Sequence, residues 1–162
     1  MKIGVYPGSF DPFTSGHLDI LTRASAVFDK IYAAVLINRL KQPFFSADER
    51  IDQIKTAALA AGLNNIRVGS FDGLLVEYAK SIGAGFIIRG LRAMTDFEYE
   101  LQLDGMNKRL APEIETIYFM AKPEYSFLSS STVKEVGYFG GSIEGLVPQI
   151  NKKMIAERLL KR

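Results

Sequence analysis

Residues 6–17 read YPGSFDPFTSGH and directly follow a short apolar run. They contain two prolines, two glycines and His17, the single histidine of the chain. Proline and glycine interrupt regular structure. Residues 2–6, by contrast, have the apolar character of a buried strand, and residues 18–28 repeat apolar side chains at helical spacing. The stretch therefore predicts an irregular loop that connects the first strand of an α/β fold to its first helix.

Strands and helices are expected to alternate along the rest of the chain. Further strands are predicted over residues 31–37, 65–69, 86–88 and 116–121, where apolar side chains run together. Further helices are predicted over residues 46–61, 74–82, 96–110 and 129–136, with a terminal helix from Pro148 to Leu160. Ser46 and Glu49 have the spacing of a capping box at a helix start. Phe97 and Leu101 are expected to point inward from their helix.

Strand–helix alternation repeated five times is typical of a parallel sheet with helices on both faces. Nearly uninterrupted apolar strands support burial on both sides. We therefore expect a Rossmann-like, doubly wound five-stranded parallel sheet with C-terminal helices. The sequence shows no internal repeat and no low-complexity linker, so one domain over residues 1–162 is the simplest interpretation.

The composition excludes several classes of protein. Lys and Arg number 20 against 18 Asp and Glu, a net charge of +2, which does not indicate general nucleic-acid binding. The absence of cysteine excludes disulfides, thiolate metal sites and a cysteine nucleophile. No apolar run approaches the length of a membrane span. We expect a cytoplasmic protein that binds neither nucleic acid nor membrane.

Four polar loops are predicted at one rim of the sheet, because each follows a strand: residues 7–17, 38–41, 89–92 and 125–131. Ligands of such sheets bind beyond the carboxyl ends of the strands. Cations, small hydroxyl groups and helix starts together suit a polyphosphate. The rim carries no P-loop, no G-x-G-x-x-G and no G-x-S-x-G, and a lone histidine argues against zinc chemistry.

Each candidate also has a purely structural interpretation. His17 could be an ordinary helix-start residue, and Ser129–Thr132 could be an N-cap. Arg89 and Arg92 could form structural salt bridges. Lysines such as Lys41 are most often solvated. The presence of all these candidate residues on one rim of the sheet favours the functional interpretation.

Three motifs carry a resemblance to a known family. They are residues 6–17, residues 89–100 (RGLRAMTDFEYE) and residues 125–135 (YSFLSSSTVKE). Together they resemble the bacterial phosphopantetheine adenylyltransferases, a family of the HxGH nucleotidyltransferases. Thr14 stands where the wider superfamily has histidine, Ser9 where the family more often has threonine, and Lys134 where the superfamily has arginine.

The resemblance implies that ATP and 4′-phosphopantetheine give dephospho-coenzyme A and pyrophosphate, by in-line attack of the acceptor phosphate. It implies catalytic roles for His17, Lys41 and Arg89. It implies an ATP site made of Ser9, Phe10, His17, Gly90, Leu91, Arg92, Glu100, Tyr125, Ser126, Phe127, Leu128, Ser129, Ser130 and Ser131. It implies an acceptor site made of Ser9, Lys41, Leu75 and Arg89.

The resemblance also implies Mg²⁺ bound with ATP, a homohexamer, and inhibition by coenzyme A. Two other functions stay open from the sequence. One is a sister nucleotidyltransferase that acts on nicotinamide mononucleotide or a small phosphorylated alcohol. The other is a nucleotide-sensing module without catalysis.

Overall fold

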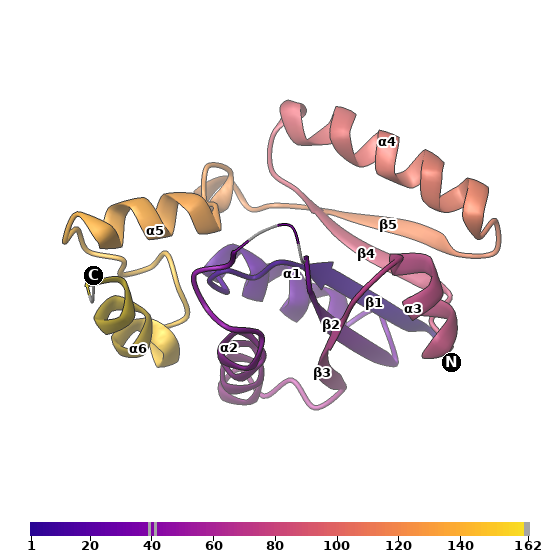
Figure 1. Cartoon of the computed structure of the whole chain (residues 1–162). Coiled ribbons are helices and arrows are strands. Elements are labelled where there is room, and N and C mark those ends of the chain that lie inside the picture. The colour runs from indigo at the N-terminus through magenta and orange to yellow at the C-terminus, as the bar shows by residue number, and fades with distance from the viewer. Residues whose placement is uncertain (39, 41, 161–162) are drawn as a thin grey trace.

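The computed structural model describes residues 1–38, 40 and 42–160. Their strands form one five-stranded sheet, in which all neighbouring strands run parallel and the order is β3-β2-β1-β4-β5 (Figure 1). The strands are β1 (Ile3–Gly8), β2 (Lys30–Leu36), β3 (Ile66–Phe71), β4 (Phe86–Leu91) and β5 (Glu115–Met120). The predicted fold class is confirmed.

The helices follow the strands in the predicted alternation. They are α1 (Ser15–Ser25), α2 (Ala47–Ala60), α3 (Leu75–Ser81), α4 (Met94–Leu110), α5 (Ser130–Tyr138) and α6 (Gln149–Leu160), with a 3₁₀ turn, η1 (Pro123–Tyr125). Figure 1 shows α5 and α6 together at one end of the molecule and α4 alongside β4 and β5. Among the described helices, none combines the length and apolar character that crossing a bilayer requires.

Both faces of the sheet are buried under helices. Side chains of a strand alternate between its two faces, so Tyr6 packs with α1 and α2 whereas Val5 packs with α3. In β4, Ile88 and Ile87 divide in the same way. This division explains why successive residues of β1 and of β4 are both apolar, and it shows that the sheet is doubly wound.

The C-terminal helices have a cluster of their own. This buried cluster joins α5 and α6 to the chain before α2. It contains Val133 of α5, Ile155 and Leu159 of α6, Leu128, and Phe45, which precedes α2. At the start of α2, the predicted capping box is confirmed. The Ser46 hydroxyl accepts from the Glu49 amide at 3.1 Å, and the Glu49 carboxylate accepts from the Ser46 amide at 2.7 Å. That residues 1–162 form one domain stays a prediction.

Two local predictions differ from the structure. Strand β4 is longer than residues 86–88, because pairing with β5 continues from Arg89↔Tyr118 to Leu91↔Met120, so Arg89 lies inside the strand. The prediction that Phe97 and Leu101 point inward was wrong, since they are 46% and 57% exposed. Other α4 residues, described below, line the cavity between this helix and the sheet.

Candidate active site

The strand order reverses between β1 and β4, and two cavities of about 440 Å³ each open there. Ligands of open α/β sheets bind at such a reversal, beyond the carboxyl ends of the strands. Pro7 and Gly8 at the end of β1 line both cavities, as does Arg89 of β4. Tyr99 and Glu100 of α4 complete the shared wall. A molecule in one cavity can therefore meet a molecule in the other.

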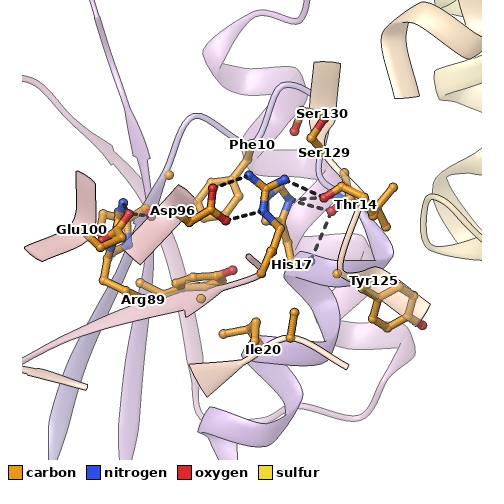
Figure 2. A pocket seen from close by; sticks show the side chains of 18 of the residues that line it. Phe10, Thr14, His17, Ile20, Arg89, Asp96, Glu100, Tyr125, Ser129 and Ser130 are labelled. Carbon is orange, nitrogen blue, oxygen red and sulfur yellow. Dashed lines mark hydrogen bonds and ion pairs between the residues drawn. The ribbon is translucent and has the colours of Figure 1, made fainter. Parts of the chain in front are cut away.

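The first cavity lies between β1, β4 and the N-termini of α1 and α5 (Figure 2). Gly8 is required here by close packing, because a β-carbon at this position would lie 2.8 Å from the Phe10 ring. Phe10 takes a positive φ of 49°, which is uncommon for a residue with a side chain. Its ring packs against the rings of Phe13 and His17, with centroids 5.6 and 5.1 Å away.

His17 is oriented by the residue that caps its own helix. Thr14 is the N-cap of α1, and its hydroxyl accepts a hydrogen bond from the His17 amide at 3.2 Å. In return, the Thr14 amide donates to Nδ1 of the His17 ring at 3.0 Å. Because Nδ1 accepts this bond, we assign the proton of the neutral ring to Nε2. Figure 2 shows His17 beside Thr14, and His17 lines the first cavity.

The surroundings of His17 keep its ring neutral. Burial, and then the positive charge of Arg92, lower the pKa of His17 to about 3. The ring of the free protein is therefore an uncharged donor near pH 7. A bound phosphate would favour the charged ring and raise this pKa.

The lowered pKa makes stability depend on pH. Between about pH 6.5 and 3 the unfolded chain binds a proton at His17 that the folded chain does not bind, so stability decreases as pH decreases in this window. From pH 7 to 5, His17 is expected to account for a loss of about 1–2 kcal/mol. Urea unfolding of the wild type and His17→Gln at both pH values measures this share. If the free energy of unfolding of His17→Gln depended on pH as that of the wild type does, His17 would not be the source of the pH dependence.

Arg89 and Glu100 form a two-bonded pair at the wall between the cavities. Nε of Arg89 donates to Oε2 of Glu100 at 2.7 Å, and Nη2 contacts Oε1. Burial opposes the charge of the guanidinium, but the hydrogen bonds and charge of Glu100 raise the pKa of Arg89. Glu100 thus fixes the plane of the guanidinium and offsets its charge, and the remaining Nη1 of Arg89 donates to the Pro7 carbonyl at 3.5 Å.

Arg92 connects β4 to the loop before α5. Its Nη1 donates to the Leu128 carbonyl at 2.7 Å, and its Nε donates to Asp96 at 3.1 Å. Ser129 is the N-cap of α5 and accepts from the Thr132 amide at 3.0 Å. The N-cap interpretation is therefore confirmed for Ser129, whereas Ser130 and Ser131 belong to the helix itself. Because Ser129 also lines the first cavity, the start of α5 faces the site as well (Figure 2).

Asp11 connects the β1–α1 loop to α5 and to the chain that precedes α2, outside the first cavity. Asp11 is 7% exposed and accepts from the amides of Phe44 and Phe45 at 3.0 and 2.8 Å. The Lys134 ammonium donates to the same carboxylate at 2.8 Å. Burial opposes the charge of Asp11, but Lys134 and the two amides outweigh it and lower the pKa of this carboxyl. Lys134, at the superfamily's arginine position, thus stabilises the loop.

Replacing Lys134 with methionine is expected to lower the free energy of unfolding by about 1–2 kcal/mol. This value is at the low end of the range for hydrogen bonds between charged groups, because the ammonium is partly solvated. Lys134→Arg keeps the charge and is expected to retain most of the stability. Chemical denaturation of both variants at pH 7 measures the difference. Equal stability of wild type and Lys134→Met would exclude a stabilising role.

The structure gathers most of the sequence-predicted residues around the two cavities. The first cavity is lined by Phe10, His17, Gly90, Arg92, Glu100, Tyr125, Leu128, Ser129, Ser130 and Ser131, and also by Arg89. The second is lined by Ser9, Leu75, Arg89 and Glu100. Leu91, Ser126 and Phe127 line neither cavity. Lys41 lies outside the described residues.

Several residues of the site were missed by sequence reasoning. Thr14 was not predicted as a helix N-cap, because the residue at the third helical position is histidine and not the glutamate of a usual capping box. Tyr99 carries no local signal of its role at the shared wall. Arg50, 3% exposed, donates to the Ser9 carbonyl at 2.8 Å and so fixes the loop from behind. Helical spacing alone would have placed Arg50 beside the buried Ile54.

The class of protein to which this chain belongs follows from its similarity to known proteins. A family model described as cytidylyltransferase-like matches residues 5–136. The fold and the site together define a nucleotidyltransferase of this cytidylyltransferase-like class. The phosphopantetheine adenylyltransferase of Caldanaerobacter subterraneus subsp. tengcongensis is 49% identical over 162 residues, 100% of this chain and 98% of the relative. That of Desulforudis audaxviator is 48% identical over 158 residues, 98% of this chain and 96% of the relative. The chain belongs to the phosphopantetheine adenylyltransferase family.

A solved structure supports the fold independently. The bifunctional NMN adenylyltransferase/ADP ribose pyrophosphatase of Francisella tularensis matches with a TM-score of 0.71 and 16% identity. The match covers 96% of this chain and 49% of that one. At this identity the likeness concerns the fold alone.

Proposed function

We propose that this chain transfers the adenylyl group of ATP to 4′-phosphopantetheine by direct in-line attack, releasing pyrophosphate and giving dephospho-coenzyme A. The observation that carries this proposal is the wall that the two cavities share at Arg89 and Glu100. Two phosphate-bearing molecules, one in each cavity, would approach each other there. The membership of the chain in the adenylyltransferase family supports the same reaction.

The chemistry requires positioning rather than a general base. The attacking oxygen belongs to a phosphate that is already an anion, so no proton has to be removed from it. Bringing two polyanions together and stabilising the charge that develops around phosphorus are the main tasks. Fixed donors in a site shielded from water meet both demands.

The first cavity suits the nucleotide. We propose that the Nε2 proton of His17 donates to the α-phosphate as charge develops there. The backbone amides of residues 129–131, at the start of α5, would hold the departing pyrophosphate. Arg92 adds a cation on the same side, and the ring of Phe10 packs beside the nucleotide. Gly90, Leu91 and the rest of residues 125–131 stay predictions as contacts to ATP.

The second cavity suits the acceptor. Arg89, held by Glu100 through Nε and Nη2, would present its Nη1 side to the acceptor phosphate, and Ser9 would contact both substrates. Leu75 and Leu74 supply apolar wall for the remainder of the molecule. From its place in the sequence alone, Lys41 is proposed to supply a positive charge to the incoming phosphate.

Magnesium is proposed to arrive with the nucleotide. Within the described residues, no group of three or more Asp, Glu or His side chains is placed to hold a metal ion. Asp96 and Glu100, which line the first cavity, are each engaged by an arginine. Mg²⁺ prefers to keep its waters and bind phosphate oxygens, so ATP can supply its ligands. The ion would offset part of the negative charge of the polyphosphate, and His17 and Arg92 would hold the polyphosphate in the site.

A direct experiment tests the function. The protein is incubated with ATP, Mg²⁺ and either 4′-phosphopantetheine or nicotinamide mononucleotide, and pyrophosphate release is followed. We expect release only with 4′-phosphopantetheine. Turnover with nicotinamide mononucleotide alone would favour the sister enzyme, and ATP binding without turnover would favour a nucleotide sensor.

We further propose that six copies assemble and that coenzyme A, which resembles the product, competes for the site. The assembly would explain an exposed apolar surface on α4, where Phe97 and Leu101 lie one turn apart. Tyr99, Met106 and Leu110 are exposed as well, but helical spacing places them on the opposite side of α4 from Phe97 and Leu101. We also propose that the enzyme acts in the cytoplasm, where ATP is available.

Replacing Leu101 with glutamate is expected to shift the protein to smaller assemblies, because it places a charge in the proposed interface. Light scattering after size exclusion measures the mass. Leu59→Glu is the matched control, since Leu59 is also exposed but lies on α2. A Leu101→Glu mass equal to that of the wild type would exclude this face as the interface.

A further inference from the structure

Tyr6 of β1 lines the first cavity, and nothing above gives its hydroxyl a role. The side chain packs with residues of α1 and α2, and the residue is only 5% exposed. The hydroxyl forms no hydrogen bond with any described residue. Buried tyrosine hydroxyls usually have a hydrogen-bond partner. The described part of the chain thus leaves a polar group at the site without one.

The Tyr6 hydroxyl opens to the first cavity. Within the described residues, the side-chain polar atoms that are both fully shielded and unpaired are Nε2 of Gln53 and Oδ1 of Asp104. The Tyr6 oxygen is not one of them, so it keeps some accessible surface although the residue is buried. Tyr6 lines the first cavity and not the second. Since the core buries the rest of the residue, the accessible part of the oxygen faces the first cavity.

Aromatic contacts place Tyr6 near His17. The Phe10 ring contacts both side chains, with its centroid 5.3 Å from that of Tyr6 and 5.1 Å from that of His17. Figure 2 shows Phe10 beside His17 at the first cavity. Tyr6 is therefore one ring away from the residue that is proposed to donate to the α-phosphate.

The charges around Tyr6 favour an anionic ligand. Three groups act on its hydroxyl through their charge: Arg89, Arg92 and Asp19. These three form ion pairs with four further residues, Glu100, Asp96, Arg23 and Lys122. The seven side chains carry four positive and three negative charges. A phosphate at the hydroxyl therefore meets a small excess of positive charge.

The Tyr6 hydroxyl is a donor near pH 7. Burial raises the pKa of Tyr6, although the charges of Arg89 and Arg92 lower it, so the proton is retained. A ligand that fills the cavity displaces water from this oxygen, and it loses affinity unless it offers an acceptor in return. A phosphate oxygen suits this donor well, because hydrogen bonds to charged oxygens are about twice as strong as those between neutral groups.

We propose that the Tyr6 hydroxyl donates a hydrogen bond to a phosphate oxygen of the nucleotide in the first cavity. The inference rests on the proposed function, which places ATP there. Tyr6 is then a neutral donor from the sheet that acts beside His17, the neutral donor from α1. Because no described residue pairs with the hydroxyl, its removal is expected to weaken the complex and not the folded chain.

The test uses the variant Tyr6→Phe, which removes the oxygen and keeps the ring. Calorimetry with Mg²⁺ at pH 7 measures the Kd of ATP, and competition with ATP measures that of adenosine. Tyr6→Phe is expected to raise the Kd of ATP about tenfold or more, the size of a hydrogen bond to a charged group. The Kd of adenosine should not change. Urea unfolding should give the variant at least the stability of the wild type.

Tyr32→Phe is the matched control. Tyr32 lies on the neighbouring strand β2 and lines neither cavity, so this variant should retain the wild-type Kd of both ligands. An equal loss of ATP affinity in Tyr32→Phe would show that the effect is not specific to Tyr6 and would overturn the inference.

The other outcomes also decide the inference. Equal ATP affinity of the wild type and Tyr6→Phe would refute the contact. A loss of the same size for adenosine would assign the hydroxyl to the sugar or the base and exclude the phosphate. A lower free energy of unfolding of Tyr6→Phe would show that the hydroxyl has a partner within the folded chain, which overturns its assignment to the ligand.

The proposed function can fail separately from this inference, because the titrations contain no acceptor. A wild type that binds ATP but releases no pyrophosphate with 4′-phosphopantetheine would refute the function and leave the contact of Tyr6 with the nucleotide to the titrations. Normal turnover of the wild type, with unchanged ATP affinity in Tyr6→Phe, would refute the role of Tyr6 alone.

Discussion

Replacing His17 with alanine is expected to lower kcat by about 10²–10³-fold, the usual loss when one fixed donor to a developing oxyanion is removed. Burial and Arg92 hold the ring neutral, and Thr14 leaves the Nε2 proton free to donate. The Kd for ATP should change little, because the bond strengthens only as charge develops. Steady-state kinetics with calorimetric titration of ATP measures both quantities.

A second variant separates donation from packing. The His17 ring also packs against Phe10 and Phe13, so alanine could disturb the loop. His17→Gln keeps an N–H donor and most of the volume, and should recover part of kcat. If His17→Ala retains the wild-type kcat, the histidine has no part in the chemistry. A nucleotide sensor whose function survives that change would then be favoured.

Replacing Arg89 with alanine is expected to raise the KM for the acceptor by about 10²-fold, in line with the loss of one member of a buried charge pair. The guanidinium is held in one plane by Glu100 at the wall that both cavities share. Arg89→Lys keeps the charge but loses the fork, so an intermediate KM is expected. Initial rates at saturating ATP and varied acceptor measure the effect.

Arg92 supplies the contrast for this experiment. It lines the first cavity and not the second. Arg92→Ala should therefore raise the KM for ATP more than that for the acceptor, the reverse of Arg89→Ala. An Arg89→Ala enzyme with unchanged acceptor affinity would remove Arg89 from the acceptor site.

The sheet and the position of the site could be predicted because their signals are local. Apolar runs marked the strands, and in a parallel sheet the residues that follow the strands converge on one rim. His17, Arg89 and Ser129 do lie around one cavity. Had they lain on different sides of the molecule, the proposed meeting of two phosphates would have failed.

Other features depend on contacts that no local pattern encodes. Asp11 reads as a loop residue, and its bond to Lys134 spans 123 positions. The apolar pattern of α4 does not distinguish a side chain in the core from one left exposed, which is why Phe97 and Leu101 were misplaced. The cavity wall on the same helix is made by Glu100 and Asp104, whose charges suggest an exposed face when only the sequence is read.

The bond between Asp11 and Lys134 has a consequence for synthesis. A chain growing on the ribosome presents the opening loop first, while Lys134, one of the residues that secure it, is added more than a hundred peptide bonds later. Contacts so distant in sequence form late. Because the start of α5, which lines the first cavity, also follows β5 in the sequence, the nascent chain is expected to complete its sheet before its proposed nucleotide site, and a product terminated before α5 would be inactive.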